Sequence, residues 1–150
     1  MKVKSLALAV PFAALYVALC LGLAPISYMD IQVRVADALY PLIGLFGWPA
    51  LFGLVVGHFI ANMFSPLGLI DLLSVIIFLP AKLTILKWKF KAVPFHVVSV
   101  ALWVAYILHS LFALPYWITA LYVGAGEFIA EIMLGYPLYY AIKRRFFKNV

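Results

Sequence analysis

Charge, cysteine and acidic residues are all scarce in this sequence. Charged side chains make up 11% of the 150 residues, compared with about 25% in soluble domains. Hydrophobic residues make up 68%, more than the interior of a soluble domain of this length can hide from water. The single cysteine, Cys20, excludes an internal disulfide. These shortages predict an integral membrane protein with one domain, residues 1–150.

Catalytic motifs are missing as well. The sequence has no His/Cys spacing typical of a metal site, no Gly-x-Ser-x-Gly nucleophile motif and no His-Glu-x-x-His motif. It also lacks a glycine-rich loop that would hold a nucleotide phosphate. We therefore expect a protein that is not an enzyme, carries no cofactor or metal of its own and does not use ATP itself.

The net charge of +6 does not indicate a nucleic-acid partner. Nearly all Lys and Arg residues lie in clusters beside apolar stretches, where they act as topology signals. The apolar stretches are continuous and do not alternate with period two, which favours helices over strands. In lipid, such helices also satisfy their own backbone hydrogen bonds. We predict an all-α bundle of six transmembrane helices, at residues 6–23, 35–46, 50–64, 69–86, 95–112 and 116–142.

The basic clusters also predict an orientation. They lie at the start of the chain, at residues 87–91 and at the end of the chain. Positively charged flanks favour the cytoplasmic side, and six helices place all three clusters there at once. We expect a multi-pass protein of the cell membrane with both termini in the cytoplasm. A cleaved signal peptide is a less favoured alternative, because the first apolar run is too long and no small-x-small site follows it.

Most polar residues of the apolar segments fall in the half of the predicted bundle that faces outside. Ionisable and polar groups are costly in a membrane, so they are candidates for function. Aromatic rings stack on flat heterocycles, and carboxylates and amides bind ring N–H and amino groups. We expect an outward-facing pocket for a planar, nitrogen-rich and roughly neutral small molecule. Its candidate residues are Gln32, Arg34, Asp37, Asn62, Asp71, His109, Trp117 and Glu127.

Several of these residues also have a structural interpretation. Arg34 is equally suited to an ion pair with Asp30 or Asp37 that shapes the first outer loop. Asp71 suits the first turn of its helix, where an acidic residue complements the helix dipole. His58 lies in the middle of a predicted helix, and we expect it to pack or to bond within that helix.

Three further polar residues are expected to have structural roles. His96 and Lys82 fall near the cytoplasmic ends of their helices, so we expect an interfacial His96 and a Lys82 that extends toward water. Glu131 lies four residues after Glu127 on the same helix face. We expect one of these two glutamates to form a hydrogen bond with a neighbouring helix. An intramembrane enzyme that uses this carboxylate pair is disfavoured, because neither residue has a visible nucleophile or metal partner.

The first predicted helix carries small residues four positions apart, at Ala9 and Ala13 and at Ala14 and Ala18. Small residues at this spacing let another helix approach closely. From spacing alone, packing within the bundle explains them as well as contact with a partner does.

Three stretches resemble known signatures. ANMFSPLGLID at 61–71, IQVRVADAL at 31–39 and Gly126-Glu127 followed by LGYPL at 134–138 are similar to patterns of the queuosine-precursor transporter family. That family consists of substrate-binding S components of energy-coupling factor (ECF) importers. The resemblance implies a subunit that captures a 7-deazaguanine precursor of queuosine outside the cell. It would deliver the solute inward with a transmembrane coupling subunit and two ATP-binding subunits, which use the ATP.

The resemblance also implies roles for particular residues. The small residues of the first helix would contact the coupling subunit. Asp37 stands where the family usually has Glu and is one methylene shorter, and Val33 stands where the family has Phe. A structural or assembly subunit without a small-molecule ligand is the alternative function. The family pattern carries over to Gln32, Arg34, Asp37, Asn62, Asp71 and Glu127.

Overall fold

The computed structural model describes residues 3–27 and 34–147, and every element in these ranges is helical. The prediction of an all-α fold is therefore confirmed. In chain order the elements are α1 (Val3–Gly22), α2 (Ala24–Ser27), η1 (Val35–Leu42), α3 (Ile43–Phe46), α4 (Trp48–Asn62), α5 (Leu69–Ile77), α6 (Leu79–Trp88), η2 (Lys89–Ala92), α7 (Val93–Phe112), α8 (Tyr116–Glu127), η3 (Phe128–Leu134) and α9 (Gly135–Phe146).

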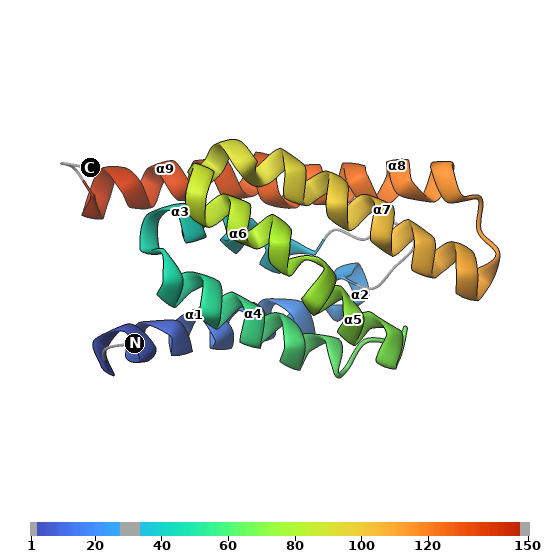
Figure 1. Cartoon of the computed structure of the whole chain (residues 1–150), viewed down its shortest axis with the longest axis horizontal. Helices are drawn as coiled ribbons and strands as arrows, with labels where there is room; N and C mark the ends of the chain where they lie inside the picture. The colour runs from blue at the N-terminus through green and yellow to red at the C-terminus, as the bar shows by residue number, and fades with distance from the viewer. Residues whose placement is uncertain (1–2, 28–33, 148–150) are drawn as a thin grey trace.

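The predicted helix at 69–86 is divided at Phe78 into α5 and α6. Pro80 lies in the first turn of α6, where its missing N–H removes no intrahelical hydrogen bond. Lys89 then takes a positive φ of 57° and ends α6. The chain reverses there, and α7 runs back beside α6 (Figure 1).

Two continuous helical stretches of the described chain are long and apolar enough to cross a membrane, Leu69–Phe112 and Tyr116–Phe146. The first has 44 residues, so a straight helix would be about 66 Å long, roughly twice the apolar thickness of a bilayer. The reversal at Lys89 divides this stretch into two arms. Three shorter apolar helices accompany them, at Ala7–Gly22, Val35–Phe46 and Trp48–Asn62.

The last predicted helix, 116–142, is a single rod made of α8, η3 and α9 (Figure 1). Its middle part, η3, is π-helical, a rare geometry that is frequent at functional sites. In Figure 1 the end of this rod and the beginning of α1 lie at the same end of the bundle, and the turn between α7 and α8 lies at the opposite end.

The small residues of α1 contribute to packing inside the chain. A Cβ atom added at Gly53 of α4 would lie 2.2 Å from the carbonyl oxygen of Ala9, and one at Gly57 would lie 2.9 Å from that of Ala13. The two helices therefore approach closely because α4 has glycine at both positions. Ala14 and Ala18, in contrast, are exposed on α1.

Candidate functional site: a buried polar cluster

The chain distributes polarity in the opposite way to a soluble protein. Its outer surface is apolar, with Leu69 83% exposed. The acidic residues that the structure describes are at most 2% exposed, and they are accompanied in the interior by two cationic side chains, Arg34 and Lys82. Burying charged groups is costly unless they are paired or functional. These acidic residues are Asp37, Asp71, Glu127 and Glu131.

Arg34 connects the beginning of η1 to the junction of α4 and α5. Its Nη2 lies 3.8 Å from Asp71 Oδ2, and its Nη1 lies 3.4 Å from Asn62 Oδ1. Asn62 Nδ2 donates to the backbone carbonyl of Asp71 at 2.8 Å, which fixes the turn between the two helices. Asp71 thus provides Arg34 with an ion-pair partner that the sequence interpretation, limited to Asp30 and Asp37, had missed.

The other oxygen of Asp71 accepts a hydrogen bond from Ser74, which in turn accepts one from Trp103. Ser74 Oγ donates to Asp71 Oδ1 at 3.0 Å, and Trp103 Nε1 donates to Ser74 Oγ at 2.8 Å. Trp103 lies on α7, so this chain of bonds ties α5 to α7. Asp71 does lie in the first turn of α5, but its buried side chain bonds across the bundle.

A second hydrogen-bond chain joins α1 to η1. Tyr40 Oη donates to Tyr16 Oη at 3.1 Å, and Tyr16 Oη donates to Asp37 Oδ1 at 2.6 Å. Tyr40 Oη also lies 3.3 Å from Nδ1 of His58 on α4. The Asp37 carboxylate is therefore held by Tyr16 of α1, and Tyr40 connects this bond to His58 on α4.

His58 is a junction of the cluster and does more than pack within its helix. Its Nε2 lies 3.0 Å from Asn62 Nδ2 and 3.3 Å from Arg34 Nη1. Its Nδ1 lies 2.7 Å from Lys82 Nζ. The expectation that Lys82 extends toward water is wrong, because its side chain is fully buried and its Nζ also lies over the ring of Tyr40.

His96, expected near the end of its helix, lies in the first turn of α7 with its side chain inside the bundle. His96 and Glu131 are both fully buried, and His96 Nδ1 lies 2.7 Å from Glu131 Oε1. This pair joins α7 to η3. One of the two glutamates was expected to bond a neighbouring helix, and Glu131 does so through His96 of α7. The other, Glu127, lies beside Asp37 in the interior.

The structure brings together five of the eight candidate site residues: Arg34, Asp37, Asn62, Asp71 and Glu127. His109 and Trp117 lie elsewhere, at the turn between α7 and α8. His109 is exposed with its Nδ1 2.6 Å from the carbonyl of Leu114, and Trp117 is 71% exposed. Gln32 and Asp30 lie outside the residues that the structure describes.

Sequence reasoning did not assign seven members of the cluster to the site. The missed members all lie within apolar helical segments, where a structural role was the simpler interpretation. They could have been identified in the same way as the others, because a polar side chain within an apolar membrane segment is costly and is therefore a candidate for function. They are Tyr16, Tyr40, His58, Ser74, Lys82, His96 and Glu131.

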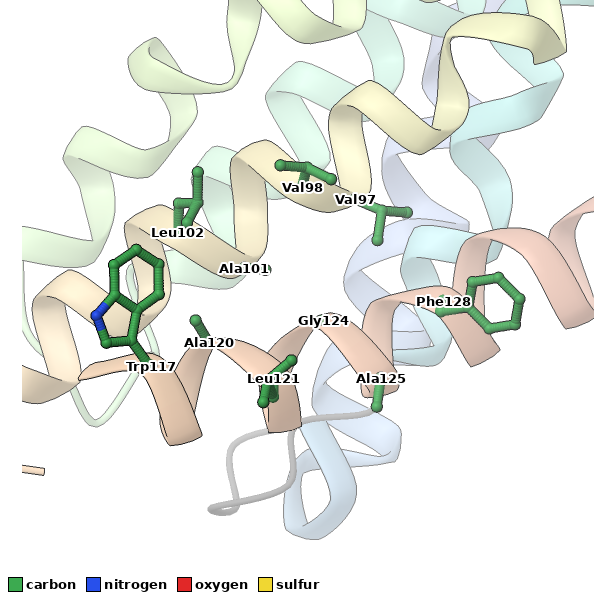
Figure 2. A pocket seen from close by; sticks show the side chains of 10 residues that line it. All are labelled: Val97, Val98, Ala101, Leu102, Trp117, Ala120, Leu121, Gly124, Ala125 and Phe128. Atoms are coloured by element: carbon green, nitrogen blue, oxygen red, sulfur yellow. The ribbon is translucent and has the colours of Figure 1, made fainter. Parts of the chain in front are cut away.

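A separate groove of about 480 Å³ runs along the surface between α7 and α8. Figure 2 shows Trp117 at one end of it and Phe128 at the other, with Ala101 and Gly124 between the two helices. Every lining side chain named in the figure is apolar apart from the indole nitrogen of Trp117. This groove cannot position a polar solute, so the buried polar cluster is the better candidate site.

An all-helical bundle with an apolar exterior and a polar centre has the properties of a membrane protein that handles a polar small molecule. The comparison with known families gives the same class. The sequence matches the QueT transporter family over residues 6–144, and the chain belongs to this family. It is therefore a membrane transport protein for a small molecule. No curated protein and no solved structure matches the chain.

Proposed function

We propose that this chain is the substrate-capture (S) component of an ECF importer and that it binds a 7-deazaguanine precursor of queuosine. One observation carries the proposal. The three stretches that resemble the family signatures are far apart in the sequence, yet Arg34 and Asp37 from the first, Asn62 and Asp71 from the second and Glu127 from the third meet in one buried cluster.

The chemistry of the cluster suits such a ligand. Carboxylates accept hydrogen bonds from the ring N–H and amino groups of a guanine-like base, and the amide of Asn62 both donates and accepts. Aromatic side chains stand beside these groups, with Tyr40 and Phe78 packed against His96. The proposed roles of Gln32, from the same first stretch, and of the exposed His109 and Trp117 rest on the sequence alone.

The proposed orientation places the six helical segments across the cell membrane with both termini in the cytoplasm. The two ends of the described chain lie at one end of the bundle, as an even number of spans requires (Figure 1). The last turn of α4 and the first turn of α5, which hold Asn62 and Asp71, lie toward the other end. The solute would then enter from outside and leave inward.

The chain would not work alone. Because the sequence has no site for a nucleotide phosphate, the energy for uphill transport would come from two ATP-binding subunits through a transmembrane coupling subunit. In this proposal the chain itself is not an enzyme and carries no cofactor.

The proposal is tested by thermal-shift and calorimetric titration of the detergent-purified chain with 7-deazaguanine precursors, guanine, riboflavin, thiamine and biotin. A ligand that binds only the native state raises its stability with the logarithm of concentration over Kd. We expect stoichiometric binding of the deazaguanines and no ATPase activity. Binding of another vitamin alone would contradict the proposed deazaguanine substrate. If folded protein bound none of these compounds, the result would favour a structural or assembly subunit.

Variants separate a binding role from a folding role. Asn62→Ala should abolish deazaguanine binding, while the matched control Tyr122→Phe, on the exposed face of α8, should bind like the parent. Both proteins should elute as single species with cooperative melts. Parental affinity in Asn62→Ala would remove the buried cluster as the site.

A further inference from the structure

Cationic side chains gather at one end of the bundle. The reversal between α6 and α7 and the last turn of α9 both lie toward that end (Figure 1). The acidic residues that the structure describes are at most 2% exposed, and none of them forms an ion pair with these cations. The positive charge of this end is therefore uncompensated within the described part of the chain. The cations are Lys87, Lys89, Lys91, Lys143, Arg144 and Arg145.

Phe90 joins the two basic segments. It lies in η2 between Lys89 and Lys91, and its backbone carbonyl accepts a hydrogen bond of 2.9 Å from Tyr136 Oη of α9. Its ring packs against three tyrosine rings of α9, with centroids 5.9 Å apart or less. The reversal is therefore fixed against α9, although Phe90 and Tyr136 are 46 positions apart in the sequence. The three tyrosines are Tyr136, Tyr139 and Tyr140.

Two cations of α9 continue the face that makes these contacts. Lys143 comes four residues after Tyr139, and a spacing of four places two side chains on the same helix face. Arg144 follows Tyr140 in the same way. Both cations therefore extend the side of α9 that packs against Phe90.

The η2 segment is also positioned by α3. A Cβ atom added at Gly44 of α3 would lie 3.1 Å from both Cα and Cβ of Lys89, so the absent side chain lets the reversal approach α3 closely. Lys89 and Lys91 thus stand on a segment that is held by both α3 and α9. Together with the two cations of α9 they form one surface, the basic patch: Lys89, Lys91, Lys143 and Arg144.

The remaining two cations already have aromatic partners and are left out of the basic patch. The Nζ atom of Lys87 lies over the ring of Trp88, 5.4 Å from its centroid, and Arg145 lies over the ring of Phe146. Both rings belong to exposed side chains, Trp88 at 57% and Phe146 at 69%. Exposed aromatic residues beside basic ones are typical of the level of lipid headgroups.

Lipid phosphate is the anionic partner that suits this position. The chain belongs to a family of membrane transporters, so lipid headgroups lie around the ends of its bundle. Positive charge alone is sufficient to set topology, whereas this patch is also fixed by a hydrogen bond, packed rings and a close glycine contact. Cations held in place on two segments can bind one phosphate between them.

We propose that the basic patch binds the phosphate of an anionic phospholipid and that this lipid joins η2 to the end of α9. The bound lipid would stabilise the reversal between α6 and α7. This inference concerns a site separate from the buried polar cluster, and it does not depend on the proposed solute.

The test uses the full chain in a nonionic detergent and two phospholipids with the same acyl chains, phosphatidylglycerol and phosphatidylcholine. Native mass spectrometry counts the lipids that stay bound and gives the apparent Kd of the first one. We expect phosphatidylglycerol to bind at least about tenfold more tightly, and added salt to reduce this preference. Equal binding of the two lipids would overturn the proposal.

Two double variants test whether both segments hold the same lipid. Lys89→Gln with Lys91→Gln removes the charge of η2, and Lys143→Gln with Arg144→Gln removes the charge of the α9 part. Either pair should weaken phosphatidylglycerol binding by at least about tenfold. Lys89→Arg with Lys91→Arg keeps the charge and should bind within about threefold of the parent. One phosphatidylglycerol still bound with parental affinity after either charge change would show separate sites and overturn the shared patch.

Tyr136→Phe tests the arrangement without changing any charge. It removes the hydrogen bond to the carbonyl of Phe90, so the two segments lose part of their fixed spacing. We expect phosphatidylglycerol binding to weaken by about threefold or more, while Tyr122→Phe, at an exposed position of α8, leaves it unchanged. Equal binding by the two tyrosine variants would overturn a patch that depends on the contact between η2 and α9.

Cooperative melts in detergent establish that each variant is folded. If a double charge variant fails to fold, Tyr136→Phe decides. A protein partner gives a different result, in which the charge variants bind phosphatidylglycerol like the parent but no longer assemble with the proposed coupling and ATP-binding subunits. That result would assign the basic patch to a protein contact and overturn the lipid site.

Discussion

The Nζ atom of Lys82 on α6 lies 2.7 Å from Nδ1 of His58 on α4, and neither side chain is exposed by more than 1%. The two residues are 24 positions apart in the sequence, and their contact closes the cluster on the side of α6. Tyr40 also touches both residues, through its hydroxyl group to His58 and its ring to Lys82. The polar cluster is therefore part of the framework that holds the helices together.

Replacing Lys82 should destabilise the protein. Lys82→Met keeps most of the apolar side chain but removes the amino group, its interaction with Asp37, Glu127 and Glu131 and its hydrogen bond to His58. We expect a loss of about 1–3 kcal/mol in unfolding free energy, seen as a lower Tm in detergent. Lys87→Met, on the exposed part of α6, should stay within about 0.5 kcal/mol of the parent. Equal melting of the two variants would contradict a role for Lys82 in the cluster.

The close packing of α1 on α4 predicts a sharp difference between two glycines. Gly53→Ala should cost about 1–3 kcal/mol, because the new Cβ would overlap the backbone oxygen of Ala9 and the helices must separate. Gly22→Ala, at the end of α1, meets nothing within 4 Å and should be neutral or stabilising by up to about 1 kcal/mol. Thermal melts of both variants in the same detergent measure the difference. A Gly53→Ala protein as stable as the parent would show that the two helices are not in this contact.

Removing the hydroxyl group of Tyr16 should weaken solute binding. Tyr16→Phe takes away the donor to Asp37 and the acceptor for Tyr40, so the Asp37 carboxylate loses its position. A lost hydrogen bond to a charged group costs about 1.5–3 kcal/mol, which corresponds to roughly 10- to 150-fold in Kd. Calorimetric titration with the tightest ligand of the panel measures this, beside Tyr122→Phe as the same change at an exposed position. Matching affinities for both variants would exclude a role of the hydrogen-bond chain in binding.

The four small residues of α1 should have two different roles. Ala9 and Ala13 pack against α4, and Ala14 and Ala18 are exposed. Ala14→Leu and Ala18→Leu change exposed positions and should weaken assembly with the proposed coupling subunit, while solute binding stays intact. Ala13→Leu, at the contact with Gly57, should lower the Tm of the isolated chain. Co-purification with the coupling and ATP-binding subunits measures assembly, and Ala125→Leu, an exposed alanine of α8, is the control. Full assembly of the Ala14 and Ala18 variants would remove this face as the contact.

The sequence was sufficient to predict helices and their approximate limits, because long apolar runs and Pro or Gly punctuation are local signals. It did not predict the break at Phe78, although Pro80 lies directly after it, or the π-helical turn η3, which no local residue marks strongly. For the site, the ends of helices were informative, since Asn62 and Asp71 flank a recognisable turn. His58, Lys82 and His96 were misjudged because the depth of a residue along its helix says little about which partners face it.

Four buried side-chain atoms of the described residues have no hydrogen bond within the chain: Asp71 Oδ2, His96 Nε2, Glu127 Oε2 and Glu131 Oε2. A solute that forms hydrogen bonds with these atoms would add its binding free energy to the stability of the fold. Synthesis, extraction and storage should then all succeed better in the presence of the solute. The compound that rescues the purified protein from aggregation would also reveal what the protein carries.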